Sequence, residues 1–230
     1  MPKKIESISQ QEVFDRIAPG WYSRRHWTIF RRELDEIAGR WNSGRLLNIG
    51  CGHGADFLPF CHSFELHGLD FSVEMLRLAR KYSVKFKFSA SLIQADAACL
   101  PYANDTFDFA IAVATFHHIR KPERRQIAFA ELFRVLRPGG EAFITVWNRW
   151  QPGFWLKPRE TFVRWRTRDK DLFRYYYLFS RRELERITLR AGFILERSFT
   201  ESSYHFPVNI FARNICLLVK KQERVDKKVI

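Results

Sequence analysis

Cysteine and long apolar runs are both scarce in this chain. It has four cysteines in 230 residues, and no two of them form a C-x-x-C pair, which is a spacing typical of redox and zinc sites. We therefore expect reduced thiols and a cytoplasmic protein. No run of 18 or more apolar residues is present, so the sequence predicts no membrane span. The first ten residues lack an apolar stretch, which disfavours a secretory signal peptide.

Acidic residues are too few to balance the basic ones, and the imbalance is local. The net charge is +14, of which +7 falls within residues 149–190, whereas residues 46–148 carry only +1. Such an excess favours a polyanionic partner that contacts the later segment. A solvated basic face is the alternative interpretation.

Helix and strand patterns alternate along the chain, with capping boxes and Pro-Gly pairs between them. Helices are expected at residues 9–18, 28–41, 55–61, 72–82, 122–136 and 180–191, and the Pro19-Gly20 pair is expected to end the first one. Strands are expected at residues 45–49, 65–69, 89–95, 107–114 and 141–147, and two further apolar runs lie at 193–198 and 214–219. This alternation predicts an α/β fold with a doubly wound, mostly parallel sheet and helices on both faces.

The length suits one domain, which we expect to span residues 1–230. Within it we distinguish an N-terminal helical substrate segment (1–45), a basic aromatic insertion (149–190) and a frayed tail (221–230).

A glycine-rich turn directly follows the first expected strand. Its sequence is Gly50-Cys51-Gly52-His53-Gly54. Glycine permits positive φ and a close approach of the backbone to a ligand, and ligands of open α/β sheets bind beyond the carboxyl ends of the strands. The G-x-G-x-G spacing departs from the G-x-G-x-x-G fingerprint of dinucleotide sites. Cysteines and histidines that could bind a metal lie close together in the sequence, at Cys51, His53, Cys61, His62 and His67. Because Cys51 and His53 are part of the ligand-binding turn itself, we expect no metal site here.

Acids end the next two expected strands. Asp70 ends the second strand, where a carboxylate can accept from both hydroxyls of a ribose. Asp96 ends the third, where it can accept from the exocyclic amine of an adenine. Each carboxylate could instead cap the turn that follows it. Beside the glycine turn, the two acids favour an adenosine-bearing ligand.

Together with Leu136-Arg137-Pro138-Gly139-Gly140 before the fifth strand, this set of motifs resembles the class I methyltransferases that use S-adenosylmethionine (SAM). The resemblance covers about residues 46–147. It implies a seven-stranded Rossmann-like sheet and SAM as cofactor. The cofactor-binding residues that it implies are Asn48, Gly50, Cys51, Gly52, Gly54, Asp70, Phe71, Asp96, Ala97 and Ala112. Asn48 stands where the family usually has an acid, and its amide brings no charge to the sulfonium.

Donor groups gather beside the expected cofactor site. Arg24 and Arg25 precede the sheet, and His117 and His118 follow the fourth strand. A carboxylate acceptor is already ionised at pH 7, so its site needs cations or donors rather than a general base. The histidines could instead belong to a turn in which their imidazoles are hydrogen-bonded, and the arginines could be solvent-exposed residues at the start of a helix.

Three stretches resemble the tRNA methyltransferases that esterify 5-carboxymethyluridine at the wobble position of the anticodon. They are residues 17–19 with Arg25, the run from His117 to Trp147, and Arg174–Phe179 with Glu183 and Leu184. The resemblance implies methyl esterification of that carboxylate, with Arg25, His117 and His118 as catalytic residues near it. It also implies a small zinc-binding activator subunit that pairs along a sheet edge, for which residues 89–95 are the candidate strand.

Residues 155–179 interleave basic and aromatic side chains. Arginines can pair with phosphates, and exposed rings can stack on the unpaired bases of an anticodon loop. The residues expected to bind substrate or RNA are Arg24, Arg124, Arg125, Arg164, Arg166, Arg168, Arg174, Tyr175 and Tyr176. Phe162, Trp165 and Phe173 could instead belong to the core.

Two other functions remain open. A small-molecule O-methyltransferase acting on a quinone or an acid would share the cofactor motifs. A SAM-binding RNA-interaction protein without catalysis is the second alternative, with Asn48 in its favour. Salt-sensitive tRNA binding separates RNA enzymes from small-molecule enzymes, and a turnover assay separates catalysis from binding.

Overall fold

A seven-stranded sheet forms the centre of the computed structural model, which describes residues 8–167, 171–203 and 208–223. Its strand order is β3-β2-β1-β4-β5-β9-β8. The strands from β3 to β5 are parallel to their neighbours, and β9 is antiparallel to both β5 and β8. The strands are β1 (Gly44–Ile49), β2 (Phe64–Asp70), β3 (Ser91–Gln94), β4 (Phe107–Val113), β5 (Leu136–Trp147), β8 (Phe193–Thr200) and β9 (Asn214–Lys221). The predicted fold class is confirmed.

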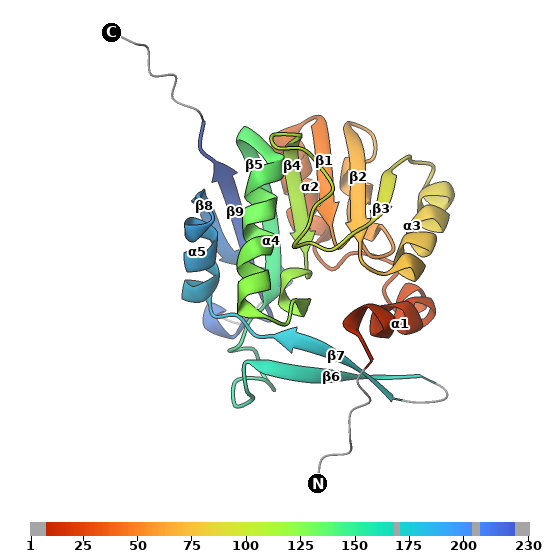
Figure 1. Cartoon of the computed structure of the whole chain (residues 1–230), viewed down its shortest axis with the longest axis vertical. Coiled ribbons are helices and arrows are strands. Elements are labelled where there is room, and N and C mark those ends of the chain that lie inside the picture. The colour runs from red at the N-terminus through yellow and green to blue at the C-terminus, as the bar shows by residue number, and fades with distance from the viewer. Residues whose placement is uncertain (1–7, 168–170, 204–207, 224–230) are drawn as a thin grey trace.

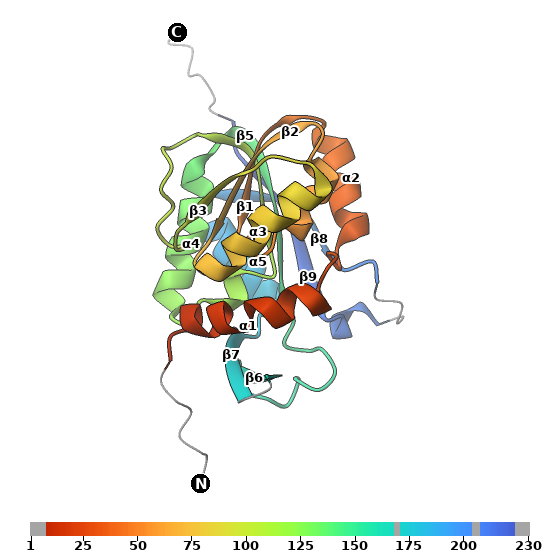
Figure 2. The same cartoon turned by 90° about the vertical axis from the view of Figure 1, so that its right-hand side faces the viewer.

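Helices cover both faces of this sheet (Figure 2). They are α2 (Arg31–Trp41), the 3₁₀ helix η1 (Ala55–Phe60), α3 (Val73–Phe86), α4 (Pro122–Val135) and α5 (Arg181–Arg190), while the short 3₁₀ helices η2 (Phe116–His118) and η3 (Asn209–Phe211) lie in the connections that follow β4 and precede β9. Successive residues of a strand point to opposite faces, so Leu47 packs in the core under α4 and α5 while Leu46 packs under α2 and η1. No helix among the described residues is long and apolar enough to cross a membrane.

Helix α1 (Gln10–Arg24) runs further than its sequence predicts. Ser9 caps its start by accepting from the N–H of Glu12, as the capping box indicates. The helix nevertheless continues through Pro19, whose ring nitrogen cannot donate within the helix. The prediction that Pro19-Gly20 ends the helix is therefore wrong. Tertiary packing offsets the lost hydrogen bond, because the ring of Trp21, in the last turn, stacks on Trp165 with centroids 5.7 Å apart.

The basic aromatic insertion contains a β-hairpin that the sequence analysis did not predict. Strands β6 (Glu160–Arg166) and β7 (Asp171–Tyr177) pair antiparallel as a separate two-stranded sheet. Trp165 and Leu172 of the hairpin pack against Phe14 and Ile17 of α1. Helix α1 and the hairpin thus lie side by side beyond one end of the large sheet (Figure 1).

Candidate active site

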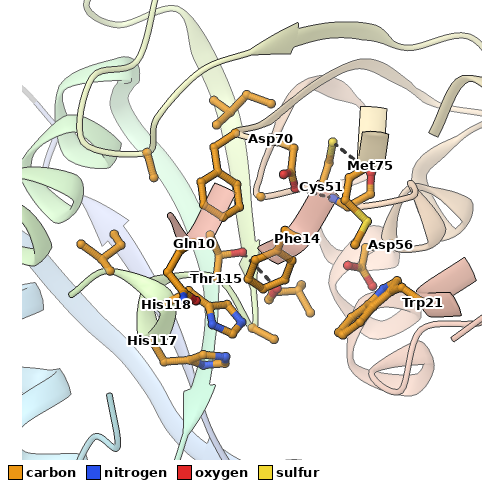
Figure 3. A pocket seen from close by; sticks show the side chains of 18 of the residues that line it. Gln10, Phe14, Trp21, Cys51, Asp56, Asp70, Met75, Thr115, His117 and His118 are labelled. Carbon is orange, nitrogen blue, oxygen red and sulfur yellow. Dashed lines mark hydrogen bonds between the residues drawn. The ribbon is translucent and has the colours of Figure 1, made fainter. Parts of the chain in front are cut away.

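A cavity of about 560 Å³ opens beyond the carboxyl ends of β1, β2 and β4. This is where ligands of open α/β sheets bind, at the point where the strand order reverses, and the volume lies within the range of about 300–1,000 Å³ found for ligand sites. Helix α1 closes the cavity on the side away from the sheet. Asp70 lies across it from His117 and His118 (Figure 3).

The turn after β1 requires glycine at two positions. Gly50 has φ +69°, and a Cβ there would lie 2.4 Å from the hydroxyl of Thr115. Gly52 has φ +52° and faces open space, because a Cβ there would meet nothing within 4 Å. Glycine adopts such dihedrals without the steric cost that a Cβ brings. The turn therefore brings bare backbone to the cavity, as a nucleotide ligand requires.

Asp70 organises the turn that it faces. One carboxylate oxygen accepts from the N–H of Gly52 and the other from the N–H of Ser72, each at 2.9 Å. Burial raises the pKa of this carboxyl to about 6. Asp56 of η1 lines the same cavity, and burial raises its pKa to about 6 as well. This wall of the cavity is acidic.

Asp96 also caps a turn and at the same time lines the cavity. Its Oδ1 accepts from the N–H of Ala98 at 2.8 Å, and its Oδ2 pairs with Arg124 at 2.7 Å. Asp70 has the same dual position. Capping and ligand contact are therefore compatible, because each carboxylate oxygen can accept more than one hydrogen bond.

The two histidines have defined tautomers. The Trp147 N–H donates to Nδ1 of His117 at 3.1 Å, so a neutral His117 carries its proton on Nε2. Nδ1 of His118 lies 2.9 Å from the carbonyl of Tyr175 and must donate to it. Burial lowers the pKa of His118 to about 3 and that of His117 well below its usual value. Both rings are neutral at pH 7, and His117 is the one with a free donor.

Cations and rings form the opposite wall. The guanidinium of Arg25 lies 5.3 Å from the centroid of Trp21, and both residues line the cavity. Tyr176 of β7 stacks on Trp147 and on His117, with centroids 4.1 and 4.9 Å apart. Helix α1 and the hairpin thus complete a site that the sheet alone would leave open.

Most of the expected cofactor residues line the cavity. Those that do are Gly50, Cys51, Gly52, Asp70, Phe71, Asp96 and Ala97. Gly54, Ala112 and Asn48 are not among the lining residues. Ala112 packs in the core, and Val113 to Thr115 line the cavity instead, because one step along a strand reverses the side-chain direction. Asn48 is fully buried, and its amide oxygen and nitrogen have no hydrogen-bond partner.

The expected RNA-binding residues divide by exposure. Arg24, Arg124, Arg164 and Arg166 are exposed, whereas Arg125, Arg174, Tyr175 and Tyr176 are buried, and Arg168 lies outside the described residues. Arg125 has a structural place instead: its Nη1 donates to the carbonyls of Ile119 and Arg120, both at 2.8 Å. The Tyr175 hydroxyl donates to the same carbonyl of Arg120. These two side chains hold the segment after η2 and cannot reach RNA.

Helix α1 supplies site residues that sequence reasoning missed. The side-chain amide of Gln10 accepts from the N–H of Tyr175 at 2.8 Å and donates to the carbonyl of Phe173. The ring of Phe14 contacts those of His118 and Phe71, with centroids 4.8 and 5.4 Å apart. The capping box located this helix, but no local signal connects Gln10 with a strand 165 residues away.

Comparisons with known proteins agree with this architecture. Residues 46–140 match a family model described as a methyltransferase domain. A methyltransferase of Encephalitozoon cuniculi is 31% identical over 193 residues, which are 78% of this chain and 84% of that protein. The tRNA (carboxymethyluridine(34)-5-O)-methyltransferase of Schizosaccharomyces pombe is 25% identical over 89% of this chain and 97% of its own length. Several longer relatives carry the same enzyme name, and this chain covers only 20 to 47% of their length.

Solved structures share the fold at low identity. The crystal structure of an S-adenosylmethionine-dependent methyltransferase from Clostridium acetobutylicum superposes with a TM-score of 0.72. The match covers 91% of this chain and 99% of that one at 15% identity. At this identity the likeness supports the sheet and its helices, and the chemistry of the site depends on its own residues.

Proposed function

Because the chain belongs to the methyltransferase family and has the class I SAM-dependent fold, we propose that it is a tRNA methyltransferase. The proposed reaction esterifies the carboxylate of 5-carboxymethyluridine at the wobble position of the anticodon. The observation that carries this proposal is the cavity with an acidic wall at the glycine turn and a cationic, aromatic wall opposite. The name of the fission-yeast relative and its match over most of both chains support the choice of substrate.

The acidic wall fits SAM. Gly52 leaves open space beside the turn, and Asp70 keeps acceptor capacity for ribose hydroxyls beyond its two backbone bonds. Asp96 and Ala97 would border the adenine. When bound, SAM supplies a methyl group attached to a positively charged sulfur, and once the methyl group has been transferred the sulfur remains in a neutral thioether. The residues of this wall orient the donor and exclude water.

The opposite wall fits an acceptor that carries its own negative charge. A carboxylate is ionised at pH 7, so no residue has to remove a proton. The neutral His117 offers its Nε2–H as a donor, and Arg25 offers a cation. His118 has its Nδ1–H occupied by the Tyr175 carbonyl, so we assign His117 rather than His118 to the carboxylate. These two groups would hold the carboxylate at this wall of the cavity and orient it for methyl transfer.

The exposed side of the hairpin suits the anticodon loop. Arg164 and Arg166 of β6 are exposed, and Phe162, two residues before Arg164 on the same strand, is 38% exposed. Guanidiniums contact phosphates, and rings stack on unpaired bases. Replacing both arginines by glutamine should weaken tRNA binding several-fold and flatten its salt dependence, whereas Arg186→Gln and Arg190→Gln together on α5 should change neither. An unchanged salt slope would count against this surface.

The proposed enzyme also includes a small zinc-binding activator subunit that pairs along β3 and acts in the cytoplasm. Strand β3 is an edge of the sheet, and its Ile93 is 39% exposed, an edge that favours pairing with another chain. Ile93→Lys should abolish stimulation by the activator. Ile194→Lys on β8, at the other edge, should not. Equal effects of the two substitutions would exclude pairing along β3.

The decisive experiment incubates the full chain with labelled SAM and tRNA that carries 5-carboxymethyluridine, with and without a candidate activator. Nucleoside mass spectrometry should detect the methyl ester. tRNA with unmodified wobble uridine is the matched control and should yield none. Transfer to a quinone or a small acid but not to tRNA would instead establish a small-molecule methyltransferase.

A further inference from the structure

Arg174 of β7 is a buried cation without an acidic partner. Its side chain is 6% exposed, and its Nε has no hydrogen-bond partner. Desolvation lowers the pKa of this guanidinium, and the other groups that shift it are Tyr176 and Arg25, neither of which is a carboxylate. Within residues 8–167, 171–203 and 208–223, no acid forms an ion pair with it. Arginine keeps its proton even when buried, so the charge persists.

Aromatic rings surround this cation in place of a carboxylate. The guanidinium carbon lies 5.6 Å from the ring centroid of Trp21, 5.1 Å from that of Trp165 and 5.3 Å from that of Tyr176. Such contacts attract a cation more weakly than an opposite charge does. Buried charges in proteins are otherwise paired, which indicates that an anion completes this cluster.

The hydroxyl of Tyr176 connects the buried cation with the cavity. Nη1 of Arg174 donates to this hydroxyl at 2.8 Å. Because arginine has donors only, the hydroxyl oxygen must accept, and its hydrogen remains available to donate. Tyr176 lines the cavity together with Arg25. Burial raises the pKa of the tyrosine above its usual value, and the guanidiniums of Arg174 and Arg25 reduce this rise because they favour the ionised form. A polarised O–H and a second cation therefore lie together at the cationic, aromatic wall of the cavity, which we call the acceptor wall because the methyl acceptor is proposed to bind there.

We propose that Tyr176 and Arg25 bind the ionised carboxylate of the acceptor, and that Arg174 acts through Tyr176 as a positioning residue that makes this subsite selective for negative charge. This inference rests on the proposed function and identifies the part of the site that distinguishes an acid from its neutral amide. The methyl ester is also neutral, so the same subsite loses its attraction for the product once the methyl group has moved. The attraction of this subsite for negative charge would then explain both the selection of the substrate and the release of the product.

The test measures binding with two anticodon stem-loop RNAs that differ at the wobble base, one with 5-carboxymethyluridine and one with 5-carbamoylmethyluridine. By fluorescence anisotropy, the wild-type chain should bind the acid about tenfold or more tightly than the amide, since charged hydrogen bonds are stronger than neutral ones. Arg174→Gln and Tyr176→Phe should each remove most of this preference, because they should weaken binding of the carboxylate RNA and leave binding of the amide RNA unchanged. Arg174→Lys should retain part of it. Arg166→Gln, on the exposed side of the hairpin, should weaken both RNAs equally and keep the preference.

Several outcomes overturn the inference. A wild-type chain without preference, or an Arg174→Gln variant that weakens both RNAs equally, would assign the cation to a backbone phosphate or to packing. If Arg174→Gln fails to fold, Tyr176→Phe, which loses one oxygen, decides in its place, with SAM affinity as the folding control. Methyl transfer is measured separately. If the wild type transfers the methyl group but shows no binding preference for the acid, only the subsite is contradicted. If the wild type does not methylate the carboxylate RNA at all, the proposed function is contradicted.

Discussion

The two walls of the cavity differ in charge and in origin. The cofactor wall consists of strand ends and the turns that follow them, and its side chains Asp56 and Asp70 are acidic. The opposite wall, where we propose that the methyl acceptor binds, includes His117 and Trp147 at the end of the sheet. Its cations, Arg25 and Arg174, come from the end of α1 and from the β6–β7 hairpin, which lie outside the large sheet. In the proposed complex, the hydrogen-bond acceptors of the cofactor wall would contact the hydroxyls of a nucleoside, and the donors of the opposite wall would contact an anion. Since different elements hold the two charges, substitutions should affect one ligand at a time.

Asp70→Ala should have the largest effect on this comparison. It removes the carboxylate that orders Gly52 and that we assign to the ribose hydroxyls, and hydrogen bonds to a charged group contribute about 1.5–3 kcal/mol each. SAM affinity measured by calorimetry should therefore fall by about a hundredfold or more. Asp35→Ala, an exposed carboxylate of α2 paired with Arg31, is the matched control and should bind normally. Retained affinity in Asp70→Ala would remove the ribose assignment.

Arg25→Ala tests the other wall. We expect turnover with carboxymethyluridine tRNA to fall by about ten- to a hundredfold, because a charged contact to the carboxylate is lost, while SAM affinity changes less than about twofold. Arg16→Ala on the same helix, where Arg16 pairs with Glu12 on the surface, should leave both unchanged. Equal losses of turnover and SAM affinity in Arg25→Ala would show that Arg25 supports the structure of both walls.

The pH dependence of SAM affinity distinguishes the walls without any substitution. Burial raises the pKa of Asp70 to about 6, and a protonated carboxyl has lost acceptor capacity. Affinity should be constant above about pH 7 and fall by up to about tenfold per unit below about pH 6. The histidines do not contribute here, because burial holds their pKa values far below this range. Calorimetry across this range measures the effect, and a flat profile would contradict it.

The contribution of Asp70 to folding stability should change with pH in the direction opposite to its effect on SAM affinity. Its folded pKa lies above the unfolded value, so the stabilisation that comes from proton binding is present at low pH and is lost as the pH rises through about 6. Asp70→Asn removes this dependence. Relative to the wild type, the variant should therefore gain stability as the pH increases from about 4 to about 8, by at most about 3 kcal/mol. Thermal unfolding measures the difference in stability between the variant and the wild type. A difference that does not change with pH would contradict the prediction.

The two walls also differ in how far the sequence predicts them. The cofactor wall follows from local patterns: apolar runs locate β1 and β2, and parallel strands bring their carboxyl ends to one edge, so Asp70 lies beside Gly52 as expected. Predicting side-chain direction was less accurate, since a shift of one residue replaced Ala112 by Val113. Strand periodicity fixes such directions only when the strand end is known to the residue.

The acceptor wall depends on contacts between distant segments, which local patterns do not contain. The sequence identified Arg174 and Tyr176 but predicted exposed RNA contacts, whereas packing of α1 on the hairpin buries both. The same packing carries α1 through Pro19. Propensity disfavours a helix there, and tertiary contacts decide otherwise.

Asn48 offers the smallest expected effect and the finest test of the cofactor wall. Its amide is fully buried in β1, has no hydrogen-bond partner and is not among the lining residues. Replacing unsatisfied polar atoms by apolar ones of similar shape is close to neutral, so Asn48→Leu should keep SAM affinity within about twofold and unfolding free energy within about 1 kcal/mol. Calorimetry and thermal unfolding measure the two quantities. A tenfold loss of affinity would mean that the amide turns toward the glycine loop when the cofactor binds, and the acidic wall would then include a neutral donor.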